Sequence, residues 1–243
     1  HGKYLNCWAC GPHRLAESLA LMLNKPLGFA LKLLGDLERE SKPLADIVLG
    51  RYQRPPGIEG LKRRHRTYLE DRGFRVAILE RLWKLEGIGF GGGSLAWRIF
   101  IPIYFRGEPV SWTTRAVGES GLRYVSAKPE QESKPHKRIL FGEDFVRDTI
   151  VICEGPFDAM KIGPGAVATC GTGFTKSQLL RMSKYPRRVV CFDNEPAGRT
   201  RARELVNTLS LFPGETFNIE LDAKDAAESS PKEIKSIRRQ FLD

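Results

Sequence analysis

The sequence has no long apolar run and few cysteines. Its 243 residues are 41% hydrophobic, yet the longest apolar runs are far too short to span a bilayer, and no charged-then-apolar signal segment opens the chain. The five cysteines are an odd number, which does not suit a disulfide framework. Cys153, Cys170 and Cys191 lie inside apolar runs, where a free cysteine is usually a core residue. We therefore expect a soluble intracellular protein with no membrane contact and one large domain or two modest ones.

A second Cys-x-x-Cys motif is also missing. Cys7 and Cys10 form one Cys-x-x-Cys-Gly turn, which is half of a zinc ribbon, whereas a structural zinc site takes four ligands. His1 and His13 would complete only a cramped site, and nothing else in the sequence supports one. We interpret the turn as the later half of a ribbon, so Zn²⁺ is expected only if the ribbon is complete in the parent protein. A plain turn explains the same residues equally well.

Negative charge is sparse in the first part of the chain. Residues 1–145 carry 24 Lys and Arg against 16 Asp and Glu, a net charge of +8, whereas residues 146–243 carry 15 against 13, a net charge of +2. The first part therefore has the electrostatic bias of a polyanion binder, and the second that of a nearly neutral catalytic module. Basic proteins are often merely soluble, so charge by itself favours nucleic-acid binding only somewhat.

A basic, β-rich region follows a connector rich in proline and glycine at residues 41–60. Residues 97–104, a turn at Arg106-Gly107 and residues 110–117 predict a β-hairpin. Arginines on strands beside aromatic residues suit phosphate and single-strand contacts, although a solvated sheet face shows the same pattern. The candidate nucleotide- and template-binding residues are Arg98, Arg115, Arg123, Lys128, Lys134 and Lys137.

From residue 150 onward, short apolar runs alternate with helical patterns, which predicts a parallel sheet flanked by helices. The expected strands are residues 150–153, 166–170, 189–192 and 217–221, and the expected helices are residues 157–162, 176 onward, 196–211 and 231 onward. Capping boxes begin at Thr175 and Ser230. The segment Gly171–Ser177 is similar to a phosphate-binding loop, but its spacing is one residue short, so we reject an ATPase.

Carboxylates follow three of the four expected strands. Because ligands bind beyond the carboxyl ends of such strands, these side chains are expected to share one crevice. Clustered carboxylates repel one another unless a cation neutralises them, and an oxygen-only set of ligands favours Mg²⁺ or Mn²⁺. Capping of turns and helices is the alternative, and it explains Asp222 well and Asp193 in part. The acidic residues are Glu154, Asp193, Glu195, Asp222 and Asp225, with Asp158 one helical turn beyond Glu154.

Four motifs of this second part resemble those of a TOPRIM domain. The first runs from Cys153 to Ala159, the second from Ala168 to Thr172 and the third from Phe192 to Arg199, while Ala223–Glu228 resembles the later Lys-Asp-x-x-Glu motif. TOPRIM domains occur in type IA topoisomerases, gyrase-type enzymes, recombination proteins, small nucleases and bacterial-type primases.

Upstream segments narrow this resemblance to the catalytic core of bacterial and bacteriophage DNA primases. These segments are Tyr68–Gly73, Phe100–Ile103 with Arg115, Arg123–Ser126 and Leu140–Gly142, and the Cys7/Cys10 turn resembles the end of the family's zinc-binding domain. The resemblance implies three domains. They are residues 1–24, a remnant of the zinc-ribbon domain with its following helix; residues 25–146, a mixed α+β basic subdomain; and residues 147–243, an α/β TOPRIM domain with a parallel sheet flanked by helices.

The resemblance also implies roles for individual residues. Glu154 would transfer a proton or orient the attacking 3′ hydroxyl, and Arg115, Arg123 and Lys128 would contact nucleotide phosphates or template. The implied catalytic residues are Glu154, Asp193 and Glu195, and the implied Mg²⁺ or Mn²⁺ ligands are Glu154, Asp158, Asp193, Glu195 and Asp225. The family usually has an Asp-x-Asp pair, whereas the second member here is Glu195.

The resemblance implies a DNA primase that makes short RNA primers on single-stranded DNA from ribonucleoside triphosphates by metal-assisted nucleotidyl transfer. No helicase motif is present, so any helicase is expected to be a separate protein or to have been cut away from this chain, and a replicative helicase is the expected partner. We expect the protein in the cytoplasm of a bacterial cell or a phage-infected host, and the divergent motifs favour a bacteriophage origin. The alternatives are a TOPRIM nuclease and a non-catalytic nucleic-acid-binding module. A topoisomerase needs a tyrosine domain for which 243 residues leave little room.

Overall fold

The computed structural model describes residues 4–7, 11–40, 50–118, 121–171 and 173–243. The chain divides into two compact units, residues 1–48 and 49–243. In the first unit, strands β1 (Tyr4–Cys7) and β2 (Gly11–Arg14) form an antiparallel hairpin that leads into helices α1 (Leu15–Met22) and α2 (Leu27–Glu40). Cys10 lies outside the described residues, so the zinc-ribbon interpretation stays a prediction. No helix in the described ranges has both the length and the apolar character to span a membrane.

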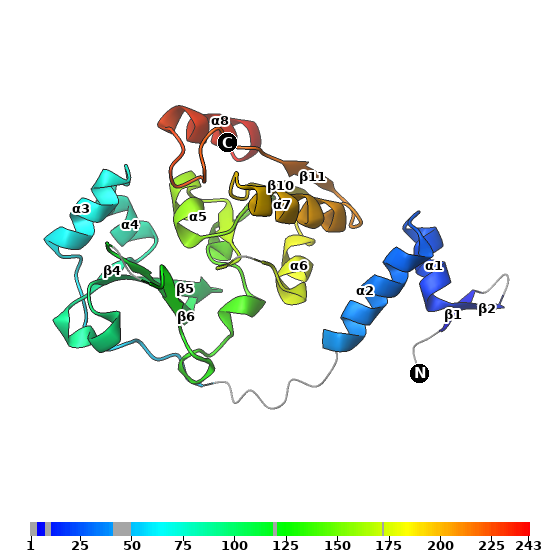
Figure 1. The fold of residues 1–243 in the computed structure, drawn as a ribbon, viewed down its shortest axis with the longest axis horizontal. Coiled ribbons are helices and arrows are strands. Elements are labelled where there is room, and N and C mark those ends of the chain that lie inside the picture. The colour runs from blue at the N-terminus through cyan, green and yellow to red at the C-terminus, as the bar shows by residue number, and fades with distance from the viewer. Residues whose placement is uncertain (1–3, 8–10, 41–49, 119–120, 172) are drawn as a thin grey trace. The chain divides into compact units, whose positions relative to one another are not determined.

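An antiparallel sheet organises the first part of the second unit (Figure 1), with the strand order β3-β4-β5-β6-β7. The strands are β3 (Ile58–Glu59), β4 (Glu86–Ile88), β5 (Arg98–Phe105), β6 (Glu108–Ala116) and β7 (Tyr124–Ser126). The predicted hairpin is β5 and β6, and both turn residues, Arg106 and Gly107, have positive φ values of 56° and 81°. Such a turn matches the twist of the two strands it joins.

Two helices and four short 3₁₀ turns complete this part of the chain. The helices are α3 (Arg63–Asp71) and α4 (Val76–Leu82), and the 3₁₀ turns are η1 (Phe90–Leu95), η2 (Pro129–Gln131), η3 (His136–Arg138) and η4 (Glu143–Phe145). Side chains alternate along β5, so Ile99, Ile101 and Ile103 pack in the same core cluster as Leu69 and Leu79 of the two helices. The opposite face of the sheet buries Phe100 against Trp112.

A four-stranded parallel sheet with the order β11-β10-β8-β9 forms the second part. Its strands are β8 (Thr149–Cys153), β9 (Ala166–Ala168), β10 (Arg187–Val190) and β11 (Glu215–Asn218). The accompanying helices are α5 (Pro156–Ile162), α6 (Lys176–Met182), α7 (Pro196–Leu209) and α8 (Pro231–Phe241). The predicted architecture of a parallel sheet flanked by helices, preceded by a mixed basic region, is confirmed.

Helices cover both faces of the parallel sheet (Figure 1). Val151 and Cys153 of β8 lie in one core cluster with residues of α5 and α8, and Ile150 and Ile152 lie in another with residues of α6 and α7. The first of these clusters continues into α3, α4 and β5, so one core joins the parallel sheet to the antiparallel region. This shared core fixes the basic region against the carboxyl edge of the parallel sheet.

The strand boundaries differ from the expected ones in places. The third strand is residues 187–190, two residues earlier than expected, and the fourth is 215–218. The early start escaped prediction because Arg187-Arg188 looks like a loop, whereas Arg188 is buried and donates to the carbonyl oxygens of Ser183 and Phe212. The second strand stops at residue 168, before Cys170 adopts a φ of 57°.

The expected domain limits, after residues 24 and 146, differ from the boundary between the two compact units, which lies after residue 48. The three-domain division therefore stays a prediction.

Candidate active site

The acidic residues reach one edge of the parallel sheet from three loops. Glu154 directly follows β8, and Asp193 follows β10 by three residues. Asn194 fastens the loop after β10 to the loop after β11, because its backbone N–H donates to the Lys224 carbonyl oxygen at 2.7 Å and its side-chain amide donates to the Leu221 carbonyl oxygen at 2.6 Å. This link brings Asp225 beside Asp193, although β11 ends seven residues before Asp225.

A cavity of about 220 Å³ lies between this acidic edge and the basic region. Carboxylates form one side of its lining and arginines the other, so the cavity joins the two parts of the second unit. The polar residues that line it are Arg72, Thr113, Arg115, Arg123, Tyr124, Ser126, Glu154, Asp158, Asp193 and Asp225, and the rest of the lining is Gly155, Pro156, Phe157, Cys170, Gly171 and Ala227. Four of the five predicted metal ligands therefore share one cavity; Glu195 is the exception.

Asp158 has its carboxylate tied to the backbone. Its Oδ2 accepts a hydrogen bond from the Gly155 N–H and its Oδ1 accepts one from the Ala227 N–H, both at 3.1 Å. Burial, followed by the charges of Asp225 and Asp193, raises the pKa of Asp158 to about 7. Asp158 thus connects the loop after β8 to the loop that carries Asp225.

Asp193 shows the same crowding of negative charge. Burial raises the pKa of its carboxyl to about 7, with further contributions from the carboxylates of Glu154, Asp225 and Glu195. A cation at this position would remove the repulsion, and carboxylate oxygens are the donors that Mg²⁺ and Mn²⁺ prefer.

Glu154 is held by an arginine that the sequence reasoning did not identify. Arg201 of α7 donates from Nη2 to both carboxylate oxygens of Glu154, at 3.0 and 2.9 Å. Glu154 is only 7% exposed. The pair therefore replaces, for this carboxylate, the hydration that burial removes.

Glu195 has a different environment from the other acidic residues. It is exposed, and its Oε1 forms an ion pair with Lys224 Nζ at 2.8 Å, which lowers the pKa of Glu195. The structure does not place this residue among those that line the cavity.

These contacts decide which residues fit a divalent cation. Across the described residues, no group of three or more His, Cys, Asp or Glu side chains is arranged as a metal site. Glu154 is paired with Arg201, Glu195 is paired with Lys224, and the Asp158 carboxylate accepts hydrogen bonds from two backbone N–H groups. Asp225 lines the same cavity as Asp193, is repelled by its charge, and accepts one backbone N–H, from Glu228 to Oδ1 at 2.9 Å, whereas Asp158 accepts two. Asp193 and Asp225 are therefore the pair whose chemistry best suits Mg²⁺ or Mn²⁺.

Arg115 is the centre of the basic side of the cavity. Its guanidinium lies 4.9 Å from the Tyr124 ring centre and 5.1 Å from the Phe157 ring centre, and its Nε donates to the Tyr68 hydroxyl at 3.0 Å. These contacts join β6 to α3, β7 and α5, and burial raises the pKa of Tyr124. Arg123, by contrast, is exposed where it lines the cavity.

The other predicted template-binding residues lie away from the cavity lining. Arg98 is buried, and its guanidinium donates to Thr114 Oγ1 and to the carbonyl oxygens of Leu122 and Arg123, so its visible role is structural. Lys128 and Lys134 are exposed, and the Lys134 ammonium lies 5.2 Å from the centre of the Phe105 ring.

Lys137 lies behind the cavity wall and points toward it. Its Nζ donates to the carbonyl oxygen of Cys170 at 2.7 Å, and a Cβ on Gly171 would lie only 2.6 Å from the same Nζ. Burial lowers the pKa of Lys137. The ammonium therefore supports the Cys170–Gly171 part of the wall, and glycine at position 171 leaves it room.

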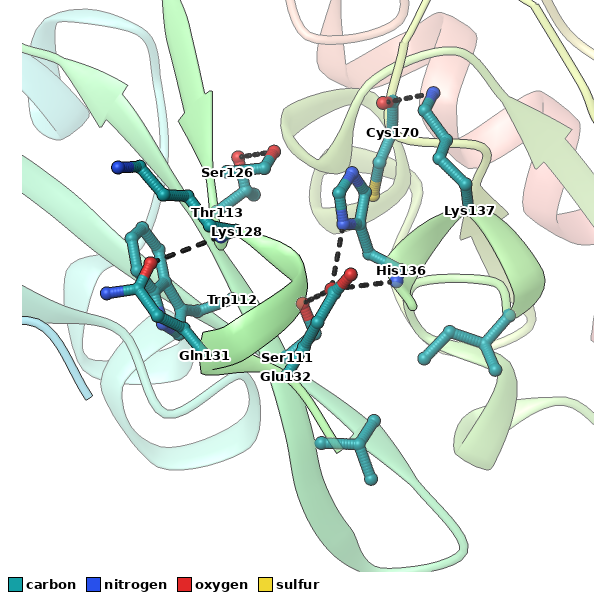
Figure 2. A network of polar contacts seen from close by, with 12 residues as sticks. Ser111, Trp112, Thr113, Ser126, Lys128, Gln131, Glu132, His136, Lys137 and Cys170 are labelled. Atoms are coloured by element: carbon teal, nitrogen blue, oxygen red, sulfur yellow. Dashed lines mark hydrogen bonds and ion pairs between the residues drawn. The ribbon is translucent and has the colours of Figure 1, made fainter. Parts of the chain in front are cut away.

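Glu132 anchors the segment that carries Lys137. Figure 2 shows its carboxylate between Ser111 and His136: Oε2 accepts hydrogen bonds from Ser111 Oγ at 2.6 Å and from the backbone N–H and Nδ1 of His136 at 3.0 Å each. Thr175, the residue that caps α6, donates from Oγ1 to the Lys137 carbonyl oxygen at 2.6 Å. This chain of bonds links strand β6 of the basic region to the wall of the cavity.

Sequence reasoning did not identify five polar residues of the site. The cavity lining includes Arg72, Thr113, Tyr124 and Ser126, and Arg201 holds Glu154. Arg72 and Tyr124 lie inside segments whose resemblance was noted, so a residue-by-residue reading of those segments was the available signal. Arg201 had only a weak one, the alternation of arginines at positions 199, 201 and 203 after the third acidic motif.

Comparisons with known proteins agree with this geometry. Residues 151–229 match the Toprim-like family. A curated DNA primase of Thermotoga maritima is 35% identical over 150 residues, which are 56% of this chain and 26% of that protein. The chain thus spans about a quarter of the length of the curated relative it matches.

Three solved primase structures have a similar fold. The Aquifex aeolicus primase, comprising zinc-binding and RNA polymerase domains, has a TM-score of 0.64 at 18% identity, over 98% of this chain and 72% of that one. The primase fragment of the bacteriophage T7 primase-helicase has a TM-score of 0.53 at 16% identity, over 93% and 84% of the two chains. A DnaG primase catalytic domain bound to single-stranded DNA has a TM-score of 0.59 at 19% identity, over 74% and 72%.

These likenesses confirm the predicted fold. Residues 151–229 are similar to the Toprim-like family, and the chain has the fold of bacterial and bacteriophage primase catalytic cores.

Proposed function

We propose that this chain is the catalytic core of a DNA primase, which joins ribonucleotides into short RNA primers on a single-stranded DNA template. The observation that carries the proposal is the cavity in which the carboxylates of the Toprim-like domain face the arginines of the basic region. A nucleotidyl transfer needs both groups, since cations must balance the phosphates and carboxylates must hold metal and handle the attacking hydroxyl.

Each side of the cavity has its own task in this proposal. Asp193 and Asp225 would hold Mg²⁺ or Mn²⁺, which supplies charge stabilisation to the phosphoryl oxygens. Glu154, fixed by Arg201, orients the 3′ hydroxyl of the growing primer, and Arg115 and Arg123 bind phosphate groups of nucleotide or template. Asp158 keeps the two acidic loops together through its backbone bonds.

The partners follow from the same proposal. A related primase catalytic domain has been solved with single-stranded DNA, which supports the same template for this chain. A related phage protein combines a primase with a helicase, which supports a replicative helicase as partner. We place the activity in the cytoplasm of a bacterial cell or of a phage-infected host, where template and ribonucleotides are present.

Primer synthesis is the direct test. The protein is incubated with mixed-sequence single-stranded DNA, labelled ribonucleoside triphosphates and Mg²⁺ or Mn²⁺, with and without a helicase. We expect short labelled products from the wild type and a loss of at least a hundredfold with Asp193→Asn. Asp222→Asn is the matched control, because Asp222 is exposed and is not among the residues that line the cavity.

A nuclease would use the same acidic residues without polymerising. A nicking assay on supercoiled DNA, with the same variants and metals, separates the two activities. Nicking without primer synthesis by the wild type would replace the primase proposal with the nuclease alternative, whereas template binding without either reaction would favour the non-catalytic module.

A further inference from the structure

Arg201 does not line the cavity itself, but it places a cation against Glu154, a carboxylate that does. Its Nη2 donates to both oxygens of Glu154, at 3.0 and 2.9 Å, and the Glu154 side chain is 9% exposed. Hydrogen bonds between two charged groups at this distance are among the stronger ones in proteins. Both oxygens that a metal ion would use are therefore engaged.

The fold brings this arginine to Glu154 by a close backbone approach. Helix α7 begins directly after Glu195, and at Gly198 an added Cβ would lie 2.1 Å from the Asp193 carbonyl oxygen and 3.2 Å from Glu154 Oε1. The missing side chain lets the first turn of α7 lie against the acidic loops. Arg201 follows three residues later, within reach of Glu154.

The remaining contacts of Arg201 show that Glu154 is its main partner. Its Nε is buried and has no hydrogen-bond partner in the described part of the chain. Among the described residues, the hydrogen bonds of the guanidinium go to Glu154, while its positive charge also acts on Asp193 and Glu195. The pair of Glu195 and Lys224 differs, because both of those side chains are 51% exposed and their attraction is weakened by solvent.

A buried carboxylate must be compensated by hydrogen bonds or by a cation, and for Glu154 the compensation comes from the cation of Arg201. A metal ion at the same oxygens would compete with the guanidinium for their lone pairs and would be repelled by its positive charge. We propose that Arg201 is a positioning residue which acts as the resident cation of Glu154, so that Glu154 enters the reaction as an arginine-bound carboxylate and metal binding is left to Asp193 and Asp225. This inference deepens the proposed function and rests on it for its catalytic meaning.

Manganese titration by calorimetry tests the inference without requiring activity. We compare the wild type with Arg201→Met and with Arg203→Met, a matched control that removes the same charge from an exposed position on the same helix. The expected result is that Arg201→Met binds an additional Mn²⁺ or binds Mn²⁺ at least tenfold more tightly, about 1.4 kcal/mol. Arg203→Met should give the wild-type isotherm.

Two further variants assign the effect to Glu154 and to charge. Adding Glu154→Gln to Arg201→Met should restore the wild-type isotherm, because the freed carboxylate is gone. Arg201→Lys keeps the charge, and it should bind Mn²⁺ as the wild type does. If Arg201→Met does not fold, as judged by circular dichroism, Arg201→Gln gives the same comparison.

An unchanged isotherm for Arg201→Met or Arg201→Gln would overturn the inference, and so would a gain that persists without Glu154. The outcome is separable from the proposed function. If the wild type makes no primers but Arg201→Met gains Mn²⁺ binding, the primase proposal is refuted and the role of Arg201 is supported. If the wild type makes primers but Arg201→Met has an unchanged isotherm, the primase proposal is supported and the role of Arg201 is refuted.

Discussion

At the scale of single residues, the structure uses buried charge in two ways. Arg201 and Glu154 meet as an ion pair at the cavity, whereas Glu132 is a buried carboxylate satisfied by a serine, a histidine ring and a backbone amide. Burial alone would raise the pKa of Glu132, but the hydrogen bonds from His136 and Ser111 outweigh it and hold the pKa below its ordinary value. Such a carboxylate stabilises the fold only while it is ionised.

Glu132 should therefore contribute a stability that depends on pH. Because its folded pKa is below its unfolded value, the contribution is complete above about pH 4.5 and is lost as the pH falls through the folded pKa. We expect Glu132→Gln to reduce the free energy of unfolding by about 2 kcal/mol at neutral pH and to flatten its decline in acid. Urea unfolding at several pH values measures both effects.

Glu130→Gln is the control for this measurement, since Glu130 is exposed and the same charge is removed. Equal pH profiles for Glu132→Gln and the wild type would contradict the assigned role of Glu132.

At the scale of elements, helix starts decide where the functional loops lie. Helix α7 approaches the acidic loops at Gly198, and α8 begins at Ser230, whose Oγ accepts a hydrogen bond from the Glu233 N–H at 3.2 Å. Glu233 does not return the bond to Ser230 as a full capping box would. Its Oε1 instead accepts from the Asp222 N–H at 2.7 Å, which fastens the start of α8 to the loop after β11.

Gly198→Ala should destabilise the protein, although alanine normally favours a helix over glycine by up to about 1 kcal/mol. The new Cβ would lie 2.1 Å from the Asp193 carbonyl oxygen, so α7 must shift, and we expect a loss of about 1–3 kcal/mol. Thermal unfolding checks this expectation, and Mn²⁺ titration reports whether Asp193 has moved.

Gly28→Ala near the start of α2 is the matched control, because nothing lies within 4 Å of its added Cβ. It should leave stability unchanged or raise it. The same loss for both glycine variants would mean that the close approach at Gly198 is not the cause.

The cap of α8 offers a second test at this scale. Ser230→Ala removes the acceptor for the Glu233 N–H, and we expect the free energy of unfolding to fall by about 1 kcal/mol. Ser236→Ala, an exposed position inside the same helix, should cost much less. Chemical denaturation of the two variants side by side gives the difference.

At the scale of the whole molecule, most of the net positive charge and the acidic edge belong to different parts of the chain. The net charge of +10 comes mostly from the first part of the chain, and the cavity joins that part to the nearly neutral Toprim-like domain. Binding of the proposed template should therefore be driven largely by the release of counterions, and the proposed chemistry should depend on the acidic edge.

Affinity for a single-stranded oligonucleotide should fall steeply as salt is raised from about 50 to 200 mM. Arg123 is exposed and lines the cavity, and Arg123→Ala should lower the magnitude of the slope of log K against log salt by about 1, the value expected for the loss of one phosphate contact. Fluorescence anisotropy measures both quantities. Arg203→Ala is the comparison outside the cavity lining, and an equal change in slope for both variants would argue against template binding at Arg123.

The sequence by itself determined the elements and the edge at which the site forms. Apolar runs gave the parallel strands, Thr175 and Ser230 marked two helix starts, and the acidic residues after the strands identified the carboxyl edge. These features depend on neighbours within a few residues, so they can be read along the chain. The motif resemblance added the primase-type fold.

Only the tertiary structure decided which charges meet. Glu154 and Arg201 form an ion pair although they are 47 residues apart in the sequence. Arg98 donates to backbone carbonyl oxygens, and the Arg115 guanidinium contacts the rings of Tyr124 and Phe157. Partners of this kind follow from the angle at which a helix or loop packs, and local sequence does not encode that angle. The sequence thus identified the carboxylates, whereas packing assigned Arg201 to Glu154 and placed Asp193 and Asp225 in the lining of one cavity.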